Sequence, residues 1–208
     1  MLNIKEKYRE LLDLYARFEN EARPHVASAV CRSGCADCCT SVGNVDVTTL
    51  EGLIILKHLQ DLPASRKKEL DKKLKDNRKL KSESKFARCA FLKADDTCSI
   101  YAVRPFSCRR LYSLKTCGVT GPTVHRHVWI LAGEIEAAIQ LLDDNGYAGH
   151  MSYVLLLLKD AKFRNTYLND GFAPDRIHDF LRTYHLSINR HASPPAADPL
   201  SKTPVPAP

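Results

Sequence analysis

The spacing of its cysteines constrains this chain more than any other feature. Four of the eight cysteines lie within nine residues, in the pattern C-x-x-x-C-x-x-C-C, as Cys31, Cys35, Cys38 and Cys39. Thiolates two or three residues apart can turn inward around one metal centre. Because adjacent side chains usually point apart, Cys38 and Cys39 are expected to serve different centres, or only one of them is a ligand. The motif therefore predicts metal binding, and a second metal centre is one of these two alternatives.

The other four cysteines are dispersed. They lie nine, ten and nine residues apart, as Cys89, Cys98, Cys108 and Cys117. This region lacks the second C-x-x-C knuckle on which zinc ribbons rely, although successive loops could present such ligands around a cluster. The sequence therefore excludes a zinc ribbon but leaves both zinc and iron open.

The expected compartment also favours ligands over disulfides. The longest apolar run, residues 154–158, is far shorter than the roughly 20 residues that a membrane-spanning helix requires. Charged residues interrupt the first 23 positions, unlike the apolar core of a secretory signal. We therefore expect a cytoplasmic protein without membrane contact, in which thiols are kept reduced.

Helical periodicity dominates the rest of the chain. Helices are expected over residues 2–23, ending before Pro24, and then over 49–60, 124–142 and 152–165, with a further helix entered at Pro174. Thr48 and Glu51 form a capping box before the second of these. Regular strands are scarce, and Trp129 is expected in or beside the core. The predicted fold is mainly α: a compact helical domain whose two cysteine-rich loop regions, 31–39 and 89–117, close over one or two metal centres.

Charge and composition mark two further segments. The stretch 66–88 holds eleven basic and four acidic residues, which accounts for the whole net charge of +7. It is expected to be a solvated helix that buries Leu70, Leu74 and Leu80. No aromatic residue interleaves its lysines, so we do not expect nucleic-acid binding. Six of the eleven prolines lie in the last sixteen residues. We therefore predict one helical metal-binding domain over 1–190 and a disordered proline-rich tail over 191–208.

Metal binding creates a charge that the protein must balance. Eight thiolates around two dications leave a formal charge of about −4, which an interior does not tolerate unpaired. Arg104 and Arg109, beside Pro105 and Cys108, are predicted to lie next to the bound group and offset this charge. Arg110 and Lys115 could do the same or be ordinary surface residues.

The motifs together resemble a known family. C-x-x-x-C-x-x-C-C followed by C-x-F-L, C-x-I-Y and R-P-x-x-C-R is similar to the signature of the YkgJ-type cysteine-cluster proteins, described as zinc- or iron-chelating. The resemblance spans Cys31 to Cys117 and implies that all eight cysteines are ligands. Flagellin lysine N-methylases are similar in the same motif, and their association is with an iron-sulfur cluster. The resemblance therefore favours an iron-sulfur cluster, of the four-iron four-sulfur type, over zinc.

Three functions stay open. The first is a redox or sensing module that carries a cluster and has an unidentified protein partner. The second is a cluster-dependent enzyme, such as a protein lysine methylase. The C-x-x-x-C-x-x-C spacing also matches the radical S-adenosylmethionine motif, but Asp37 stands where an aromatic is usual and alternating strands and helices are missing. The third is a structural zinc module for protein interactions.

No residue is assigned a catalytic role. His125 and His127 begin a helix, where an offset of two residues directs the rings to different faces, so they are expected to be poor partners for one metal. His150, His178 and His185 are not expected to be ligands either.

Overall fold

The structure is a computed structural model that describes residues 2–41, 44–84, 86–118 and 121–191. Within these residues the fold is mainly α-helical, as predicted. It also contains one small sheet. The α-helices are α1 (Ile4–Val26), α2 (Asp37–Ser41), α3 (Thr49–Gln60), α4 (Ala64–Glu83), α5 (Phe106–Arg109), α6 (Arg126–Leu142), α7 (Met151–Lys159), α8 (Ala161–Leu168) and α9 (His178–Tyr184). The predicted tail lies almost wholly outside the described residues, and the single domain over 1–190 stays a prediction.

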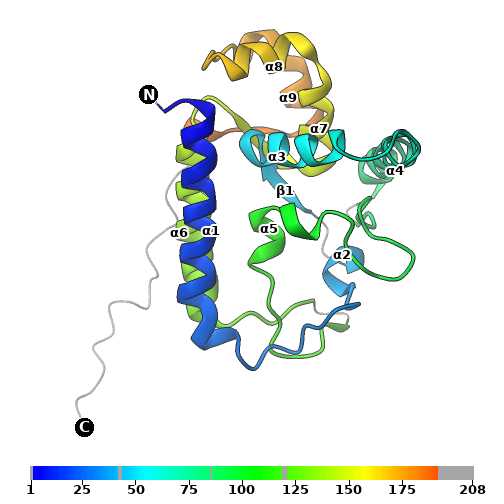
Figure 1. Ribbon diagram of the computed structural model, residues 1–208, viewed down its shortest axis with the longest axis vertical. Helices are drawn as coiled ribbons and strands as arrows, with labels where there is room; N and C mark the ends of the chain where they lie inside the picture. The colour runs from blue at the N-terminus through cyan, green and yellow to red at the C-terminus, as the bar shows by residue number, and fades with distance from the viewer. Residues whose placement is uncertain (1, 42–43, 85, 119–120, 192–208) are drawn as a thin grey trace, which may run out of the picture.

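Two long helices form one side of the molecule. In Figure 1, α1 and α6 lie side by side along its length, and they are in extensive contact. Phe18 and Ala22 of α1 pack with Val128 and Ala132 of α6, and all four side chains are buried. Phe106 of α5 belongs to the same apolar cluster. The helix that bears Cys108 is therefore anchored on the α1–α6 pair.

A second apolar cluster surrounds α7. Val154 and Leu158 of α7 are fully buried against α3, where Gly52 allows the close approach. Leu70 and Leu74 bring α4 to the same cluster. At the top of Figure 1, α8 and α9 follow α7 along the chain. The apolar side chains of α3 contribute to both clusters, which links the two halves of the molecule.

A small antiparallel sheet lies between the clusters. Its strands are β1 (Asp46–Thr48), β2 (Tyr147–His150) and β3 (Ser187–Ile188), in the order β1-β2-β3. Asp46 pairs with His150, and Ala148 pairs with both Thr48 and Ser187. The sequence analysis missed these strands because segments of two to four residues show no alternating pattern. Short 3-10 turns follow or precede the longer elements: η1 (Tyr101–Val103), η3 (Pro174–Ile177) and η4 (Asn189–His191).

The helix boundaries confirm one expectation and correct two. The capping box of Thr48 and Glu51 begins α3, which ends at Gln60 as predicted. The first helix runs past Pro24 to Val26, because a proline in the last turn removes only one backbone donor. The expected helix over 152–165 is two helices, since Asp160 adopts an extended conformation and its carboxylate accepts a hydrogen bond from Phe163 N at 2.7 Å, capping α8.

Two burial predictions were wrong. Trp129 is 61% exposed and lies on the outer face of α6, with the Arg110 guanidinium 5.8 Å from its ring centre. Leu80 is also exposed, and Asn77 takes the corresponding buried position on α4 by donating to Arg88 O at 2.7 Å. The buried edge of α4 is therefore shorter than its leucines suggest.

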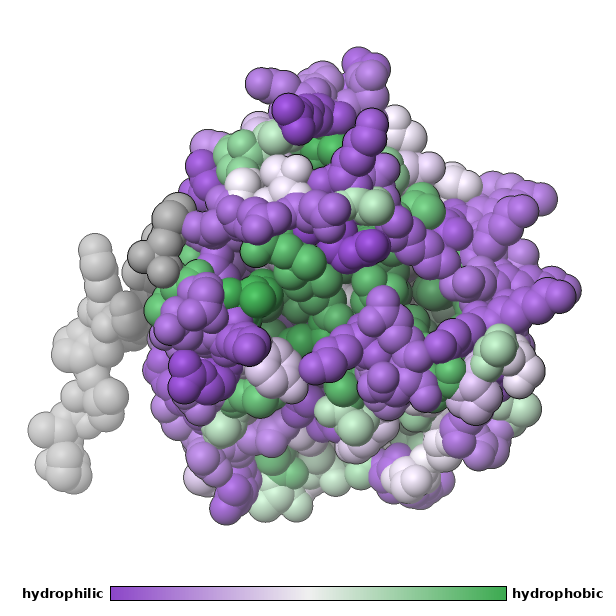
Figure 2. Space-filling model, turned by 45° about the horizontal axis from the view of Figure 1, so that its top comes forward, coloured by the Kyte–Doolittle hydropathy of each residue, from purple (hydrophilic) through white to green (hydrophobic). Residues whose placement is uncertain are grey.

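On the face in Figure 2, hydrophilic residues cover the projecting parts, and hydrophobic residues gather in the hollow at its centre. No helix within the described ranges combines the length and apolar character that a membrane span would need.

Candidate metal centre

The first cysteine region is a tight turn followed by α2. Cys35 N donates to Arg32 O at 3.0 Å, and Gly34 takes the left-handed conformation, φ +81°, that this turn requires. Cys39 N then donates to Ala36 O at 2.8 Å as α2 begins. Cys31 and Cys35 therefore lie on an exposed loop, whereas Cys38 and Cys39 lie on a short helix and are half-buried.

The second region folds back onto the first. Cys89 N donates to Cys39 O at 2.8 Å, which joins the two regions through the backbone. Leu92 pairs with Cys98 as an isolated antiparallel bridge, and Ser99 N donates to Phe91 O at 2.9 Å. This turn returns the chain on itself, so that Cys89 and Cys98 face the same neighbourhood although nine residues separate them.

Glu51 positions the helix that carries Cys108. The side chain of Glu51 is only 4% exposed, and its Oε1 accepts hydrogen bonds from Phe106 N at 2.7 Å and from the Tyr15 hydroxyl at 2.6 Å. Its Oε2 accepts from Thr48 N at 2.9 Å. One carboxylate thus fixes the first residue of α5, the start of α3 and a side chain of α1. Sequence reasoning identified only the capping box, because the other partners are distant in the chain.

Electrostatic coupling divides the cysteines into two sets. Burial raises the pKa of Cys108, and the negative charges of Cys89, Cys38 and Cys98 raise it further. Burial also raises the pKa of Cys89 to about 11, again with contributions from Cys98 and Cys38. Cys38, Cys89, Cys98 and Cys108 therefore lie within one another's fields, and we call them the inner cysteine set. Four thiols placed together in this way resist joint ionisation unless a cation compensates them.

Cys39 is coupled to the inner set through its neighbour. A hydrogen bond with Cys39 is the main reason that the pKa of Cys38 is raised, ahead of burial and of the charge on Cys39. The expectation that adjacent cysteines serve different centres stays a prediction.

The remaining three cysteines form an outer cysteine set: Cys31, Cys35 and Cys117. Burial raises the pKa of Cys117, and the charges of Asp37, Cys31 and Cys35 add to this effect. Ser113 N donates to Cys31 Sγ at 3.3 Å, while Val30 N donates to Ser113 O at 2.8 Å. The segment before Cys117 therefore lies alongside the loop that carries Cys31.

The two predicted arginines differ in their surroundings. The guanidinium of Arg104 lies 3.9 Å over the Tyr101 ring, and its charge lowers the pKa of Cys98, against the dominant effect of burial. Arg109 pairs with Glu19 at 2.6 Å and donates from Nε to Arg104 O at 3.0 Å. Arg109 thus holds α5 against α1, whereas the positive charge of Arg104 acts on Cys98 of the inner cysteine set. Their role beside a bound group stays a prediction.

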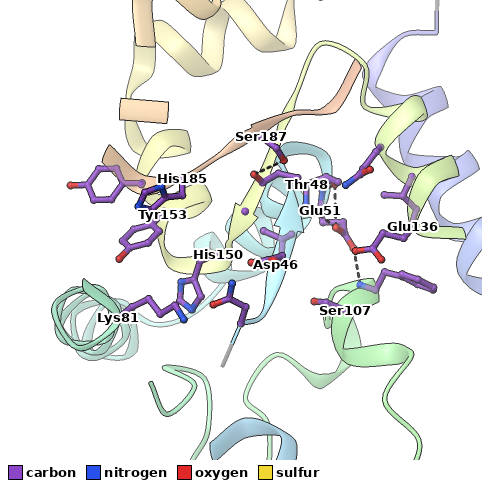
Figure 3. A pocket seen from close by; sticks show the side chains of 18 of the residues that line it. Asp46, Thr48, Glu51, Lys81, Ser107, Glu136, His150, Tyr153, His185 and Ser187 are labelled. Carbon is purple, nitrogen blue, oxygen red and sulfur yellow. Dashed lines mark hydrogen bonds between the residues drawn. The ribbon is translucent and has the colours of Figure 1, made fainter. Parts of the chain in front are cut away.

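A cavity of about 480 Å³ opens beside α5 (Figure 3). Ser107, the neighbour of Cys108, lines it, and the buried Ser107 hydroxyl has no hydrogen-bond partner among the described residues. Asp46 and Glu136 line the same cavity, and burial, followed by the charge on Glu136, raises the pKa of Asp46. Burial lowers the pKa of His150 on its wall to about 4. Sequence reasoning missed this cavity because its lining comes from segments far apart in the chain.

The histidine prediction was partly wrong. His125 and His127 do come together, and His25 joins them from the end of α1. His125 is the N-cap of α6, with φ −60° and ψ 139°, so the angular offset of two helical residues does not apply to this pair. His150 instead bonds through Nδ1 to the Ser152 hydroxyl at 2.8 Å.

One comparison with known proteins bears on these sites. Residues 30–123 match the model of the CxxCxxCC family, described as a putative zinc- or iron-chelating domain. No curated protein and no solved structure is significantly similar to the chain. The match spans both cysteine regions and all eight cysteines, and it covers just under half of the chain. Residues 30–123 are therefore similar to this cysteine-cluster domain.

Proposed function

We propose that the inner cysteine set holds an iron-sulfur cluster and that the protein is a redox or sensing module. The observation that supports this most is that the two cysteine regions meet, because Cys89 N donates to Cys39 O at 2.8 Å, and the charges of Cys89, Cys38 and Cys98 raise the pKa of Cys108. Four cysteine thiolates are the usual ligands of a four-iron four-sulfur cluster. Such a cluster, when bound, would supply one-electron chemistry; the chain supplies the ligands and their surroundings.

The charge of Arg104 near Cys98 also suits this proposal, since it lowers the pKa of that thiol, against the dominant effect of burial. When a cluster is bound, a nearby cation would stabilise the negative charge that is added on reduction.

The test is anaerobic purification followed by iron, zinc and acid-labile sulfide analysis and an absorption spectrum of the same sample. We expect iron with matching sulfide and broad absorption near ~400 nm. Cys98→Ser should lose most of both, whereas Cys31→Ser, a matched change in the outer set, should keep the iron and sulfide of the inner set. Stoichiometric zinc without sulfide would instead indicate a structural module. Equal iron and sulfide in the wild type and Cys98→Ser would contradict the assignment of ligands.

A cluster-dependent enzyme is the second candidate because of the cavity beside α5. Its lining includes Ser107, which directly precedes Cys108, and a carboxyl pair, Asp46 and Glu136. A small molecule held there would lie near the inner set. Gln140→Trp would obstruct the cavity, and Gln60→Trp at the end of α3 is its control. If the protein is an enzyme of this kind, we expect a small molecule bound in the cavity to co-purify with the control but not with Gln140→Trp.

A further inference from the structure

Three histidine rings converge where the α1–α6 pair ends. The donor nitrogens available on His25, His125 and His127 all lie within 4.8 Å of one another. The rings of His25 and His125 are stacked, with centroids 4.6 Å apart, and the His127 ring meets His25 edge-on at 4.9 Å. The three side chains thus form one compact cluster of imidazoles.

The backbone beneath this cluster is well supported. His25 lies in the last turn of α1, and His125 and His127 lie at the first turn of α6. Directly next to these turns, Ala22 and Val128 are buried in the contact between the two helices. Because helices rather than free loops carry the rings, little conformational entropy is lost when the nitrogens are brought onto one ion.

The chemistry of the cluster suits a divalent transition metal. A metal takes the neutral form of imidazole, and each of the three rings offers one nitrogen to a shared ion. Three nitrogens around a tetrahedral zinc lie about 3.3 Å apart, so each separation has to close by at most about 1.5 Å, which is a shift of less than about 1 Å per ring. His127 is exposed, which leaves the fourth position open to water.

One hydrogen bond competes with metal binding. His125 Nδ1 accepts from His127 N at 3.2 Å and caps α6. Ligation through Nδ1 removes this acceptor, and ligation through Nε2 moves the ring proton to Nδ1, with the same result. A metal must therefore replace the cap, which predicts a weaker and more exchangeable ion than one held by thiolates.

We propose that His25, His125 and His127 form a further metal site, which takes zinc or a similar divalent ion. The site is distinct from both cysteine sets, because its residues lie just outside the family segment 30–123, on either side of it. A metal there would fasten together the two points where the cysteine-bearing segment leaves α1 and enters α6. This proposal does not depend on an iron-sulfur cluster.

The experiment is equilibrium dialysis of the full-length protein, as purified with its cysteine-bound metal, against zinc. We expect the wild type to retain one zinc per chain more than the double variant His25→Asn with His127→Asn. His125→Asn should lose the same zinc while keeping α6 intact, because asparagine is a strong N-cap residue. His178→Asn changes an exposed histidine on α9 and should bind as the wild type does.

Two measurements make the result decisive. Circular dichroism establishes that each variant is folded, and imidazole ¹⁵N NMR of the wild type reports directly on the rings. Three histidines should shift together as one equivalent of zinc is added. Equal zinc retention by the wild type and His125→Asn, or imidazole resonances that do not move, would overturn the proposal.

Discussion

At the residue scale, burial of polar groups is the main cost that the structure has to balance. Asp143 is fully buried, yet its carboxylate accepts from Leu50 N at 3.0 Å and from Asn189 Nδ2 at 2.9 Å. Lys7 is likewise buried and donates to Asp144 and Asn145, each at 2.9 Å. Asp143 and Lys7 thus both have specific partners, which offset the cost of their burial.

His150 is the buried group whose titration is easiest to test. Burial, and then the charge of Lys81, lowers its pKa to about 4, whereas an unfolded histidine titrates near 6.5. Between about pH 4 and pH 6.5, His150 is protonated in the unfolded chain but not in the folded protein. The contribution of His150 to stability is therefore full above about pH 6.5 and is lost as the pH falls toward 4, by up to about 1.4 kcal/mol per pH unit.

His150→Gln provides the comparison. Denaturant unfolding of both proteins at pH 7 and pH 5 should show the stability advantage of the wild type decreasing by roughly 1–2 kcal/mol at the lower pH. The other titratable groups are the same in both proteins, so their contributions to the pH dependence of stability cancel in this comparison. An advantage that is the same at both pH values would contradict a lowered pKa.

At the element scale, the short helix α5 depends on contacts outside itself. It has four residues and no side-chain cap, so its own hydrogen bonds cannot hold it. Phe106 packs edge-on against Phe18 with centroids 4.9 Å apart, and Glu51 accepts from its first backbone donor. The placement of Cys108 therefore follows from α1 and α3.

Glu51→Ala tests this dependence. It leaves the buried Tyr15 hydroxyl and the backbone donors of Thr48 and Phe106 without their acceptor, at about 1–3 kcal/mol for each group. We expect a loss of at least about 3 kcal/mol in denaturant unfolding and a lower metal content. The control is Glu69→Ala, because Glu69 pairs with Arg66 and Lys73 on the exposed face of α4. Wild-type metal content in a folded Glu51→Ala protein would show that α5 is placed by other contacts.

The contrast between α3 and the site shows what local sequence can predict. The α3 boundaries were predictable because the capping box acts within four residues. The cysteine regions were predictable from their spacing. The division of the cysteines into an inner and an outer set was not predictable, because the packing of α3 and α4 is what brings Cys38 and Cys108 together. His25 was missed for the same reason: its partners lie about one hundred residues later in the chain.

At the scale of the whole molecule, the inner cysteine set joins segments that are distant in the chain. About seventy residues separate Cys38 from Cys108, and α3 and α4 lie between them. A bound group that links these residues closes this long loop and reduces the entropy of the unfolded chain. A single cross-link over such a loop contributes roughly 4 kcal/mol.

Metal removal should therefore destabilise the fold. Chelation of the metal in the purified protein should lower its Tm by about 10 °C, given the loop-closure contribution and the size of the chain. Cys98→Ser, without a complete inner set, should start at the lower Tm and respond little to the chelator. An unchanged Tm in the wild type after verified metal loss would mean that binding and folding are uncoupled.

The unequal exposure of the cysteines also determines the order in which reagents modify their thiols. Cys31 and Cys35 lie at the surface, whereas the four cysteines of the inner set are half-buried and Cys117 is buried. Oxidants and alkylating reagents reach exposed thiols first. Damage should therefore begin at Cys31 and Cys35, and the lifetime of the inner set would depend on how long the loop that carries them keeps its shape.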